Sequence, residues 1–359
     1  MTKKKILIAT GGTGGHIFPA YSLANYLKDK NFEIELTTDK RGLKYLQNYK
    51  NLNLKIIPLS PLKKNTIFTF LKSVLIILYS IIKSFNILLY NRPSIIFGMG
   101  GYASFPICIA ASILRINFVI YENNLIIGKA NKYLLPFAKK IFVSYNEVEG
   151  IPEKYRKKIF EIGNIVREEI VNFKLINNKD NEFNKLNILI LGGSQGAKVF
   201  AEILPRILKK INESIVPIMV YQQCLKDQKN NLIKFYSEAK IDCEIFNFTD
   251  NIIDYYSKAN LVITRSGASV LGELINIKIP LILIPLPTSA DNHQYKNAEF
   301  YSKKGYGYLL DEREINDKLF NIVNSMYNDK SFANNFLSNQ GKYSDKDIFK
   351  NLIIQLEKI

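Results

Sequence analysis

The sequence contains no tryptophan, two histidines and three cysteines among its 359 residues. Cys108, Cys224 and Cys243 are far apart and form no CxxC pair. This spacing argues against a disulfide framework and against a structural zinc site. We therefore expect a reducing, cytoplasmic compartment.

The sequence also lacks a long uninterrupted apolar run. Residues 67–90 are very apolar, but Lys72 and Lys83 divide them. The longest piece that remains is Ser73 to Ile82, whereas a membrane-spanning helix needs about 20 residues. We expect a domain helix that is mostly buried and does not span a membrane, although its lysines and aromatics could also lie at an anionic bilayer.

Acidic residues are in the minority, because 49 Lys and Arg face 32 Asp and Glu, a formal charge of +17. Such an excess attracts nucleic acid, anionic lipid or phosphorylated substrates, and it also fits a generally lysine-rich composition. No RNP, helix-turn-helix or zinc motif is present, so we expect no nucleic-acid partner. The basic start is followed by a short apolar run that ends in glycines, without a signal-peptide cleavage site.

Short β-rich runs alternate with helix-period stretches along the whole chain, which predicts parallel sheets with crossover helices. The first predicted helix covers residues 19–30. The predicted strands are 6–9, 34–37, 95–97, 118–121, 141–144, 187–191, 218–221, 243–246, 261–264 and 281–284. Ligands in such sheets bind at the carboxyl ends of the strands.

The pattern restarts near the middle of the chain. Residues 177–185 are polar, and residues 187–208 then repeat the order strand, Gly-Gly turn, helix that opens the sequence at residues 5–27. The length is sufficient for two cores. We therefore expect an α/β fold of two Rossmann-like, doubly wound parallel-sheet domains that face each other across a cleft.

The first glycine turn, GGTGGH at residues 11–16, joins a strand to a helix. Its backbone N–H groups and the helix dipole suit a phosphate or sugar oxygen, although a tight turn alone would look the same. Ile17 replaces the third glycine of GxGxxG, which disfavours a dinucleotide. His16 could take up a proton near neutral pH, or it could simply cap or pack.

Four further segments follow predicted strands. GGSQG at 192–196 could bind a diphosphate, and TRSGA at 264–268 opens a helix in which Glu273 could bind ribose hydroxyls or be merely solvated. GMGGY at 98–102 and ENN at 122–124 should face the same crevice, with close packing and turn capping as the simpler interpretations.

Together these blocks resemble the MurG family of glycosyltransferases. The resemblance rests on GGTGGH, GMGGY, ENN, GGSQGA at 192–197, RSGA at 265–268 and DNHQ at 291–294, in this order. It implies the GT-B fold, with an acceptor- and membrane-facing domain at 1–163 and a domain that binds UDP-N-acetylglucosamine at 164–340. The C-terminal helix at 341–359 should pack back on the first domain.

The resemblance also assigns roles to individual residues, with His16 or Glu122 as the catalytic base. The residues implied at the sugar end of the donor are Thr13, Gly14, Gly15 and Asn124, with Gln294 on the sugar hydroxyls. Those implied at the phosphates, ribose and uracil, or facing the same crevice, are Tyr102, Arg167, Ser194, Thr249, Arg265, Ala268, Ser269, Val270, Leu271, Gly272 and Glu273.

Three positions depart from the family pattern. Tyr121 and Asn123 stand where relatives often have His and Gln, and Ala201 replaces an expected asparagine. These changes weaken any role for Tyr121 or Ala201, and they leave His16 as the single histidine in the motifs of the first half.

By resemblance, the enzyme transfers N-acetylglucosamine with inversion from UDP-N-acetylglucosamine to lipid I, which is undecaprenyl-diphosphate-linked MurNAc-pentapeptide. The reaction takes place at the cytoplasmic face of the plasma membrane, with the enzyme as a peripheral protein. The resemblance requires no metal or cofactor. The one DxD, Asp345 and Asp347, lies in a polar stretch, and we interpret it as solvated surface.

Two other enzymes share the expected scaffold. One is a GT-B glycosyltransferase that acts on diacylglycerol, against which GMGGY and ENN argue. The other is UDP-N-acetylglucosamine 2-epimerase, whose soluble substrate would leave the apolar helix without a membrane role. An epimerase turns over without an acceptor, so incubation with the sugar nucleotide alone separates the two classes.

Overall fold

The computed structural model describes residues 3–12, 14–46, 53–59, 66–173, 185–249 and 251–359. The chain divides into two units, residues 1–168 together with 345–359, and residues 169–344. These divisions fall a few residues after the boundaries predicted at 163/164 and 340/341. Arg167, which we expected in the second domain, therefore belongs to the first unit.

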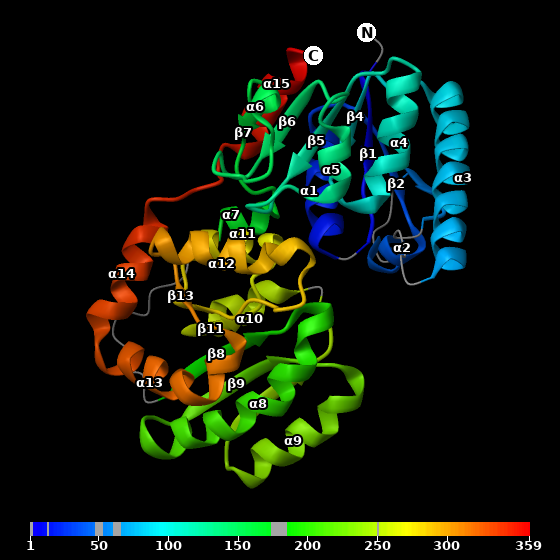
Figure 1. Cartoon of the computed structure of the whole chain (residues 1–359). Coiled ribbons are helices and arrows are strands. Elements are labelled where there is room, and N and C mark those ends of the chain that lie inside the picture. The colour runs from blue at the N-terminus through cyan, green and yellow to red at the C-terminus, as the bar shows by residue number, and fades with distance from the viewer. Residues whose placement is uncertain (1–2, 13, 47–52, 60–65, 174–184, 250) are drawn as a thin grey trace. The chain divides into compact units, whose positions relative to one another are not determined.

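The first unit is built on a parallel sheet in the order β3-β2-β1-β4-β5-β6-β7 (Figure 1). Its strands are β1 Lys5–Ala9, β2 Glu33–Thr38, β3 Asn53–Ile56, β4 Ile95–Gly98, β5 Phe118–Glu122, β6 Lys140–Val143 and β7 Ile159–Glu161. Its helices are α1 Gly14–Asp29, α2 Lys40–Leu46, α3 Ile67–Asn91, α4 Gly101–Ile113, α5 Lys129–Leu134, α6 Glu153–Arg156 and α15 Ile348–Glu357. Helix α7, Glu168–Val171, lies at the division between the units.

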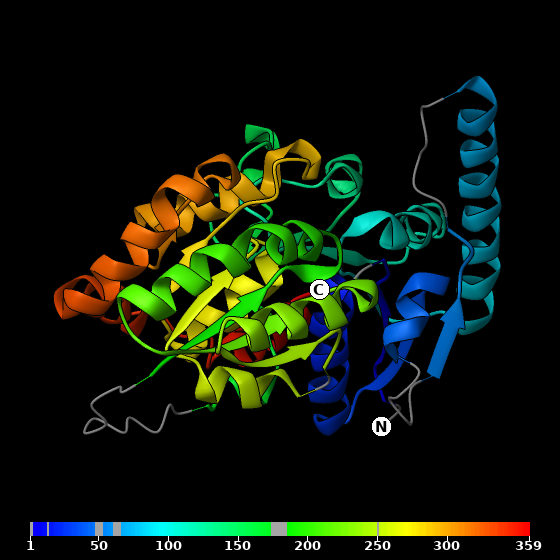
Figure 2. The same ribbon diagram turned by 90° about the horizontal axis from the view of Figure 1, so that it is seen from below.

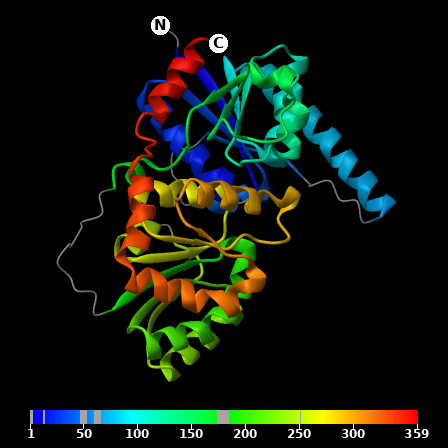
Figure 3. The same cartoon turned by 60° about the vertical axis from the view of Figure 1, so that its left-hand side comes forward.

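Alternation along the strands of the first unit produces two cores. Ile6 and Ile8 of β1 pack with α1 and α15, while Leu7 and Ala9 pack with α4 and α5 on the other face. The C-terminal helix α15 thus covers the same face as α1 (Figure 3). There Tyr26 and Phe349 stack with ring centroids 4.5 Å apart. Burial on both faces explains why these strands read as continuous apolar runs.

The second unit repeats the arrangement, with the order β10-β9-β8-β11-β12-β13 and parallel pairing throughout. Its strands are β8 Leu186–Leu191, β9 Ile218–Gln223, β10 Asp242–Phe246, β11 Leu261–Thr264, β12 Leu281–Leu283 and β13 Tyr308–Leu309. Its α-helices are α8 Gly193–Ser214, α9 Lys229–Glu238, α10 Ile252–Lys258, α11 Ala268–Ile277, α12 His293–Lys303, α13 Ile315–Asn328 and α14 Lys330–Gly341. Three 3₁₀ turns are η1 Lys226–Gln228, η2 Ala290–Asn292 and η3 Glu312–Glu314.

The predicted strands all form, but three of the four edge strands were missed, since β10 alone among them was predicted. Strands β3, β7 and β13 were not predicted, because each is short and only partly buried, with little apolar patterning. Helix α1 begins at Gly14 rather than at Pro19, so the glycine turn is itself the first turn of the helix. The polar stretch that we used to mark the restart lies mostly outside the described residues.

Helix α3 corrects an expectation. A domain helix of this kind should bury its apolar side, yet its buried residues are Ser73, Ser80, Ser84 and Leu88. The most buried positions of α3 are therefore mostly serines, with Phe85 and Ile87 partly buried against the same core, and the Ser80 hydroxyl contacts the carbonyl of Pro58. Helix α3 lies at the edge of the first unit (Figure 2), and its exposed side chains include Leu71, Leu75 and Ile82.

Helix α3 is also the one helix in the described part of the chain that is long and apolar enough to cross a membrane by length and composition, with a window hydropathy of 1.8. Two lysines were too few to remove it from that class. Only 22% of the most apolar 18-residue segment of α3 is buried inside the unit.

Asp345 is a second correction. We interpreted the DxD as solvated surface, but Asp345 is 3% exposed, and its Oδ1 accepts a bond of 2.9 Å from Asn164 N. Only Asp347 is exposed. The polar composition of this stretch led us to expect an exposed carboxylate. Asp345 is buried instead, where it satisfies the backbone N–H of Asn164.

Candidate active site

In the first unit, the predicted segments meet where strand order reverses. Strands β1 and β4 are neighbours in the sheet, and their helices α1 and α4 cover opposite faces. The turn after β1 passes so close to α4 that a Cβ on Gly11 would lie 2.4 Å from the Cβ of Ala103. Ligands of open α/β sheets bind at such a switch point.

His16 lies in the first turn of α1, at this switch point. Its carbonyl accepts a bond of 2.9 Å from the Thr10 hydroxyl. Its ring lies against the start of α4, with Cε1 3.5 Å from the Cβ position of Gly100 and Nε2 3.3 Å from that of Gly101. Both glycines have positive φ, 83° and 70°, so the chain can turn here with no side chain in the way of the imidazole.

Glu122 ends β5 and is only 4% exposed. Its Oε1 accepts bonds from Asn124 N at 3.1 Å and Asn124 Nδ2 at 3.0 Å. Its Oε2 accepts bonds from Gly128 N at 2.8 Å and Asn131 Nδ2 at 3.0 Å. The carboxylate therefore holds the turn from β5 to α5, and it orients Asn124, the residue implied at the donor sugar.

Asn131 and Asp39 are polar residues at this edge that the sequence analysis missed. Asn131 is 1% exposed in α5 and bridges Glu122 to the Tyr121 carbonyl. Asp39 follows β2, and its Oδ1 accepts bonds of 2.9 Å from both Gly12 N and Gly42 N. The position of Asp39 directly after a predicted strand was a usable signal, whereas nothing in the sequence distinguishes Asn131.

Hydrogen bonding decides the charge state of Asp39. Burial would raise its pKa, but bonds from Gly12 N, Gly42 N and the Arg41 guanidinium outweigh burial, so the pKa lies below the ordinary value. An ionised carboxylate thus clamps the glycine turn to the start of α2.

The other predicted residues of the first unit are less enclosed. Tyr102 is 44% exposed in the first turn of α4. Gly14, Gly15 and Arg167 are partly exposed, the first two in the opening turn of α1. Thr13 lies outside the described residues.

In the second unit, the equivalent switch point lies between β8 and β11. Helix α8 starts at Gly193, whose φ is +64° and whose N–H donates to Gln223 Oε1 at 3.1 Å. Ser194 is in the first turn of α8, and its side chain lies outside the described part of the chain. The GGSQG segment thus lies at the start of a helix, and binding of a diphosphate there stays a prediction.

Arg265 follows β11 but points into the unit. It is 3% exposed; its Nη1 donates to the carbonyls of Ile284 at 3.3 Å and Pro285 at 3.2 Å, and its Nη2 pairs with Glu312. Its guanidinium stacks over the Phe200 ring at 4.4 Å. Burial lowers its pKa, against the opposing effect of Glu312. These contacts attach the chain after β12 to η3.

Helix α11 carries the predicted run from Ala268 to Glu273 directly after Gly267. Glu273 is half-buried, and its Oε2 accepts a bond of 2.9 Å from the hydroxyl of Tyr256 in α10. Tyr256 is 1% exposed and was not predicted, because a tyrosine in an ordinary helix gives no functional signal.

Gln294 is the second residue of α12, which begins after two residues with positive φ, Asp291 and Asn292. Its Oε1 accepts bonds from Ser266 N at 3.2 Å and Leu286 N at 3.0 Å. Since two backbone N–H groups hold the oxygen, the amide nitrogen is the group that Gln294 can offer to a ligand. Thr249 is half-buried after β10, and its hydroxyl accepts a bond from Asn251 N.

The matches to known families agree with this arrangement. Residues 6–143 match the model of the glycosyltransferase family 28 N-terminal domain, and residues 187–352 match the family 28 C-terminal domain. A curated protein of Pelagibacter ubique (strain HTCC1062) is 38% identical over 327 residues, which cover 90% of each chain. The chain belongs to glycosyltransferase family 28.

The Pelagibacter relative is named UDP-N-acetylglucosamine--N-acetylmuramyl-(pentapeptide) pyrophosphoryl-undecaprenol N-acetylglucosamine transferase. Among solved structures, Acinetobacter baumannii MurG matches with a TM-score of 0.80 at 22% identity, covering 100% of both chains. A putative UDP-N-acetylglucosamine 2-epimerase of Listeria monocytogenes matches with 0.69 at 14% identity, covering 99% and 96%. At these identities the structures show the fold alone, which is GT-B-like.

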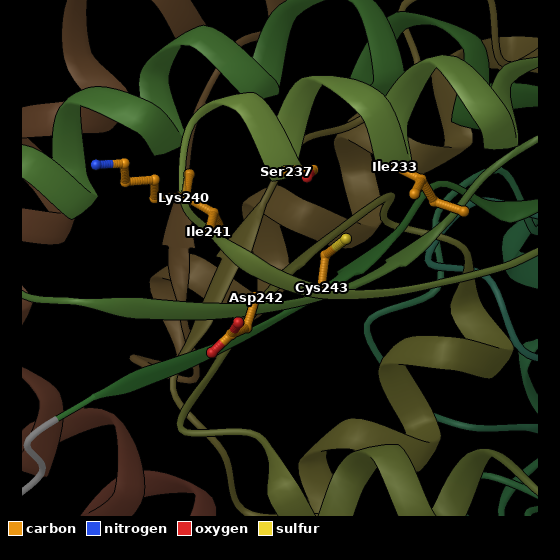
Figure 4. A pocket seen from close by; sticks show the side chains of 6 residues that line it. All are labelled: Ile233, Ser237, Lys240, Ile241, Asp242 and Cys243. Carbon is orange, nitrogen blue, oxygen red and sulfur yellow. The ribbon is translucent and has the colours of Figure 1, made fainter.

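A shallow depression lies elsewhere on this family 28 chain, between α9 and β10 (Figure 4). It is lined by Ile233, Ser237, Lys240, Ile241, Asp242 and Cys243. Asp242 is the first residue of β10, so the depression lies at the amino end of the strand. Because the site loops follow carboxyl ends, this depression is not part of the site.

Proposed function

We propose that this chain transfers N-acetylglucosamine from UDP-N-acetylglucosamine to the 4-hydroxyl of the MurNAc sugar of lipid I, forming lipid II in peptidoglycan synthesis. The observation that carries the proposal is the 38% identity, over 90% of both chains, to a relative with that named activity. The strand ends of both units carry the residues that such a reaction needs.

The reaction is a single displacement with inversion. The acceptor oxygen forms a bond to the anomeric carbon of N-acetylglucosamine, and the bond from that carbon to the diphosphate oxygen breaks. UDP departs with the electron pair, and the acceptor hydroxyl loses its proton to the protein. The site must therefore supply a base and stabilise a leaving diphosphate.

His16 is the proposed base. Its imidazole lies at the β1–β4 switch point beside Gly100 and Gly101, and imidazole is well suited to accept a proton near neutral pH. The other histidine, His293, lies in the second unit with Nδ1 2.7 Å from the Ala290 carbonyl. Glu122 has a different proposed task, because its carboxylate already accepts hydrogen bonds from Asn124, Gly128 and Asn131.

The leaving nucleotide is the proposed ligand of the second unit. The start of α8 offers backbone N–H groups and the positive end of a 22-residue helix dipole to the diphosphate. Glu273 would accept bonds from the ribose hydroxyls, and Gln294 would donate its amide N–H groups to oxygens of the sugar. Arg167 would add positive charge as UDP leaves.

The test is transfer of radiolabelled N-acetylglucosamine from UDP-N-acetylglucosamine to a lipid I analogue, with product separated by chromatography. Label in the lipid product supports the proposal. Label transferred to diacylglycerol instead would assign the chain to the other glycosyltransferase class. Epimerisation of the sugar nucleotide without any acceptor would assign the epimerase activity, whose scaffold this chain shares.

We also propose that the enzyme works as a peripheral protein at the cytoplasmic face of an anionic membrane. Lipid I is a membrane lipid, and α3 exposes apolar side chains that include Leu71, Leu75 and Ile82 at 54%, 66% and 61%. Exposed apolar patches of this kind mark interaction surfaces. The net charge of +17 adds attraction to anionic lipid.

A further inference from the structure

The Glu122 carboxylate has its hydrogen-bonding capacity filled by protein. A carboxylate offers about four lone-pair sites. Two N–H groups of Asn124 occupy Oε1, and the N–H of Gly128 and an N–H of Asn131 occupy Oε2, at 2.8 to 3.1 Å. A proton from an acceptor hydroxyl would therefore have to displace one of these donors.

Displacement would be costly because the carboxylate and its donor Asn131 are buried, whereas Asn124 is half-buried and Gly128 is exposed. Glu122 is 4% exposed and Asn131 is 1% exposed. Two of the four donors are backbone N–H groups, which lose their partner if the carboxylate becomes protonated or turns away. A buried donor without a partner carries a desolvation penalty. The arrangement thus holds the Glu122 carboxylate in one orientation.

Asn131 fixes this carboxylate from the side of α5. Its Nδ2 donates to Glu122 Oε2 and to the Tyr121 carbonyl, both at 3.0 Å. Its Oδ1 is buried with no hydrogen-bond partner in the described structure. Rotation of the amide would place this oxygen against two other oxygens, so the donor role sets the orientation even though one oxygen stays unsatisfied.

The Asn131 amide also lies close to Gly100, which lies beside the imidazole of His16. The Cβ position of Gly100 lies 3.4 Å from Asn131 Nδ2, 3.3 Å from the Tyr121 carbonyl and 3.5 Å from His16 Cε1. Gly100 is therefore enclosed between the Asn131 amide and the imidazole. Movement of Asn131 or Glu122 would be passed through Gly100 to His16.

We propose that Glu122 and Asn131 are a pair of positioning residues, and that His16 alone accepts the proton of the acceptor hydroxyl. This inference rests on the proposed glycosyl transfer. Glu122 holds the turn that carries Asn124, and Asn131 locks Glu122 to β5 and supports Gly100 behind His16.

The kinetic test compares Glu122→Gln, Asn131→Ala and His16→Ala across pH 5.5 to 9. Glutamine keeps the size of Glu122 but turns two acceptor sites into donors. We expect Glu122→Gln and Asn131→Ala each to lower kcat about 10- to 100-fold and to keep the decline of kcat at acid pH where the wild type shows it. His16→Ala should remove that decline and lower kcat by about 10²- to 10⁴-fold.

Loss of the acid decline in Glu122→Gln would overturn the proposal, since Glu122 would then be the titrating base. The double variant Glu122→Gln with Asn131→Ala gives a second criterion. Residues that act as one unit show non-additive effects, so the double variant should be no slower than the slower single variant within about twofold. Multiplied losses would contradict the pairing.

A second measurement does not depend on turnover. The chain has only His16 and His293, so histidine Cε1–H signals in NMR can be assigned with His293→Gln. We expect Glu122→Gln and Asn131→Ala to shift the His16 signal and leave the His293 signal in place. An unmoved His16 signal in both folded variants would overturn the proposal, and Asn131→Ala serves alone if Glu122→Gln does not fold.

Glu35→Gln is the matched control. Glu35 is a buried carboxylate of the same unit, 1% exposed, whose partners are Lys5 and Lys55 on neighbouring strands. We expect it to lower stability while kcat, its pH dependence and the His16 signal stay as in the wild type. The two proposals can fail separately. If the wild type transfers no sugar but the Glu122 and Asn131 variants still shift the His16 signal, the proposed function is refuted and the positioning pair is supported.

Discussion

At the scale of single residues, we predict that Tyr256 and Glu273 act together in nucleotide recognition. A glutamate can bind both hydroxyls of a ribose only if its carboxylate is held at a fixed angle. Tyr256 is 1% exposed, and its hydroxyl donates a hydrogen bond of 2.9 Å to Glu273 Oε2. We therefore expect Tyr256 to act on nucleotide binding through Glu273, with an effect that depends on the ribose.

Tyr256→Phe should weaken UDP binding about tenfold, because it removes one bond to a charged group and keeps the ring. Glu273→Ala should weaken it about 10- to 100-fold by removing the ligand itself. Calorimetric titration with UDP measures both. With 2′-deoxy-UDP, the loss caused by Tyr256→Phe should shrink, because one of the hydroxyls that Glu273 would bind is missing.

Tyr236→Phe is the control for this comparison. Tyr236 is fully buried in the same unit, and its hydroxyl donates to Gln222 Oε1 at 2.6 Å. It should lower stability without changing UDP affinity. An equal loss of affinity in the Tyr236 variant, or equal losses for the two nucleotides, would contradict the role given to Tyr256.

At the scale of secondary-structure elements, Asp39 links the end of β2, the start of α2 and the glycine turn after β1. Its Oδ1 accepts from Gly42 N in the first turn of α2 and from Gly12 N in the turn. Because its folded pKa is depressed, it contributes stability that is present above the unfolded pKa of about 3.9 and is lost as pH falls through the folded pKa.

Asp39→Asn should therefore destabilise the protein most at neutral pH. The asparagine oxygen can still accept from Gly12 and Gly42, but its NH₂ group would face the Arg41 guanidinium. Urea midpoints from pH 7 to pH 3 should show a gap to the wild type that narrows below about pH 4. Asp29→Asn, at the exposed end of α1, is the control and should keep the urea midpoint of the wild type at each pH. A difference between Asp39→Asn and the wild type that widens in acid would contradict the stabilising role of the ionised Asp39.

Helix α3 buries serines and exposes large apolar side chains, the reverse of the usual pattern. Its serines face the unit, while Leu71, Leu75 and Ile82 recur at helical spacing on the opposite side. Replacing these three residues by serine removes apolar surface that is already exposed. Folding should therefore change little, whereas insertion into a bilayer should lose about 1 kcal/mol or more for each side chain.

The triple serine variant should bind vesicles that contain an anionic phospholipid at least tenfold more weakly than the wild type, as measured by co-sedimentation. Ile233→Ser is the control, since Ile233 is 42% exposed on α9 and has no proposed contact with lipid. Undiminished vesicle binding by a folded triple variant would place the membrane contact elsewhere.

The sequence predicted the elements that bury apolar residues and missed those that depend on contacts between distant segments. The strands around His16 and Glu273 were predicted because apolar runs and glycine turns are local signals. Asn131, Asp345 and the serine face of α3 were not, because burial of a polar side chain depends on which backbone groups the fold brings beside it.

At the scale of the whole molecule, the chain leaves the first unit after residue 168 and re-enters it at residue 345. Both passages are attached to the first unit by one buried polar network. Asp345 Oδ1 accepts from Asn164 N at 2.9 Å, and the Tyr121 hydroxyl accepts from Ile165 N at 3.0 Å. Tyr121, where relatives often have histidine, thus has a structural task.

Gly163 shows how closely the two passages meet. Its φ is +95°, and a Cβ at this position would lie 2.3 Å from Asp345 Oδ1. Any side chain here would push the carboxylate away from Asn164. The carboxylate, rather than the polar composition around it, keeps residues 163–165 and the start of α15 together.

Asp345→Ala should destabilise the first unit by about 1–3 kcal/mol, because it leaves the buried N–H of Asn164 without its partner. At about 2–4 °C per kcal/mol for a unit of this size, the melting transition of that unit should fall by several degrees. Hydrogen exchange should quicken at Asn164, Ile165 and α15 and stay unchanged at β8 and β11. Asp347→Ala is the control, because it removes the exposed neighbouring carboxylate and should change neither the melting transition nor the exchange rates. Equal effects from the two variants would mean that the charge of this stretch, and not the bond to Asn164, joins the two passages.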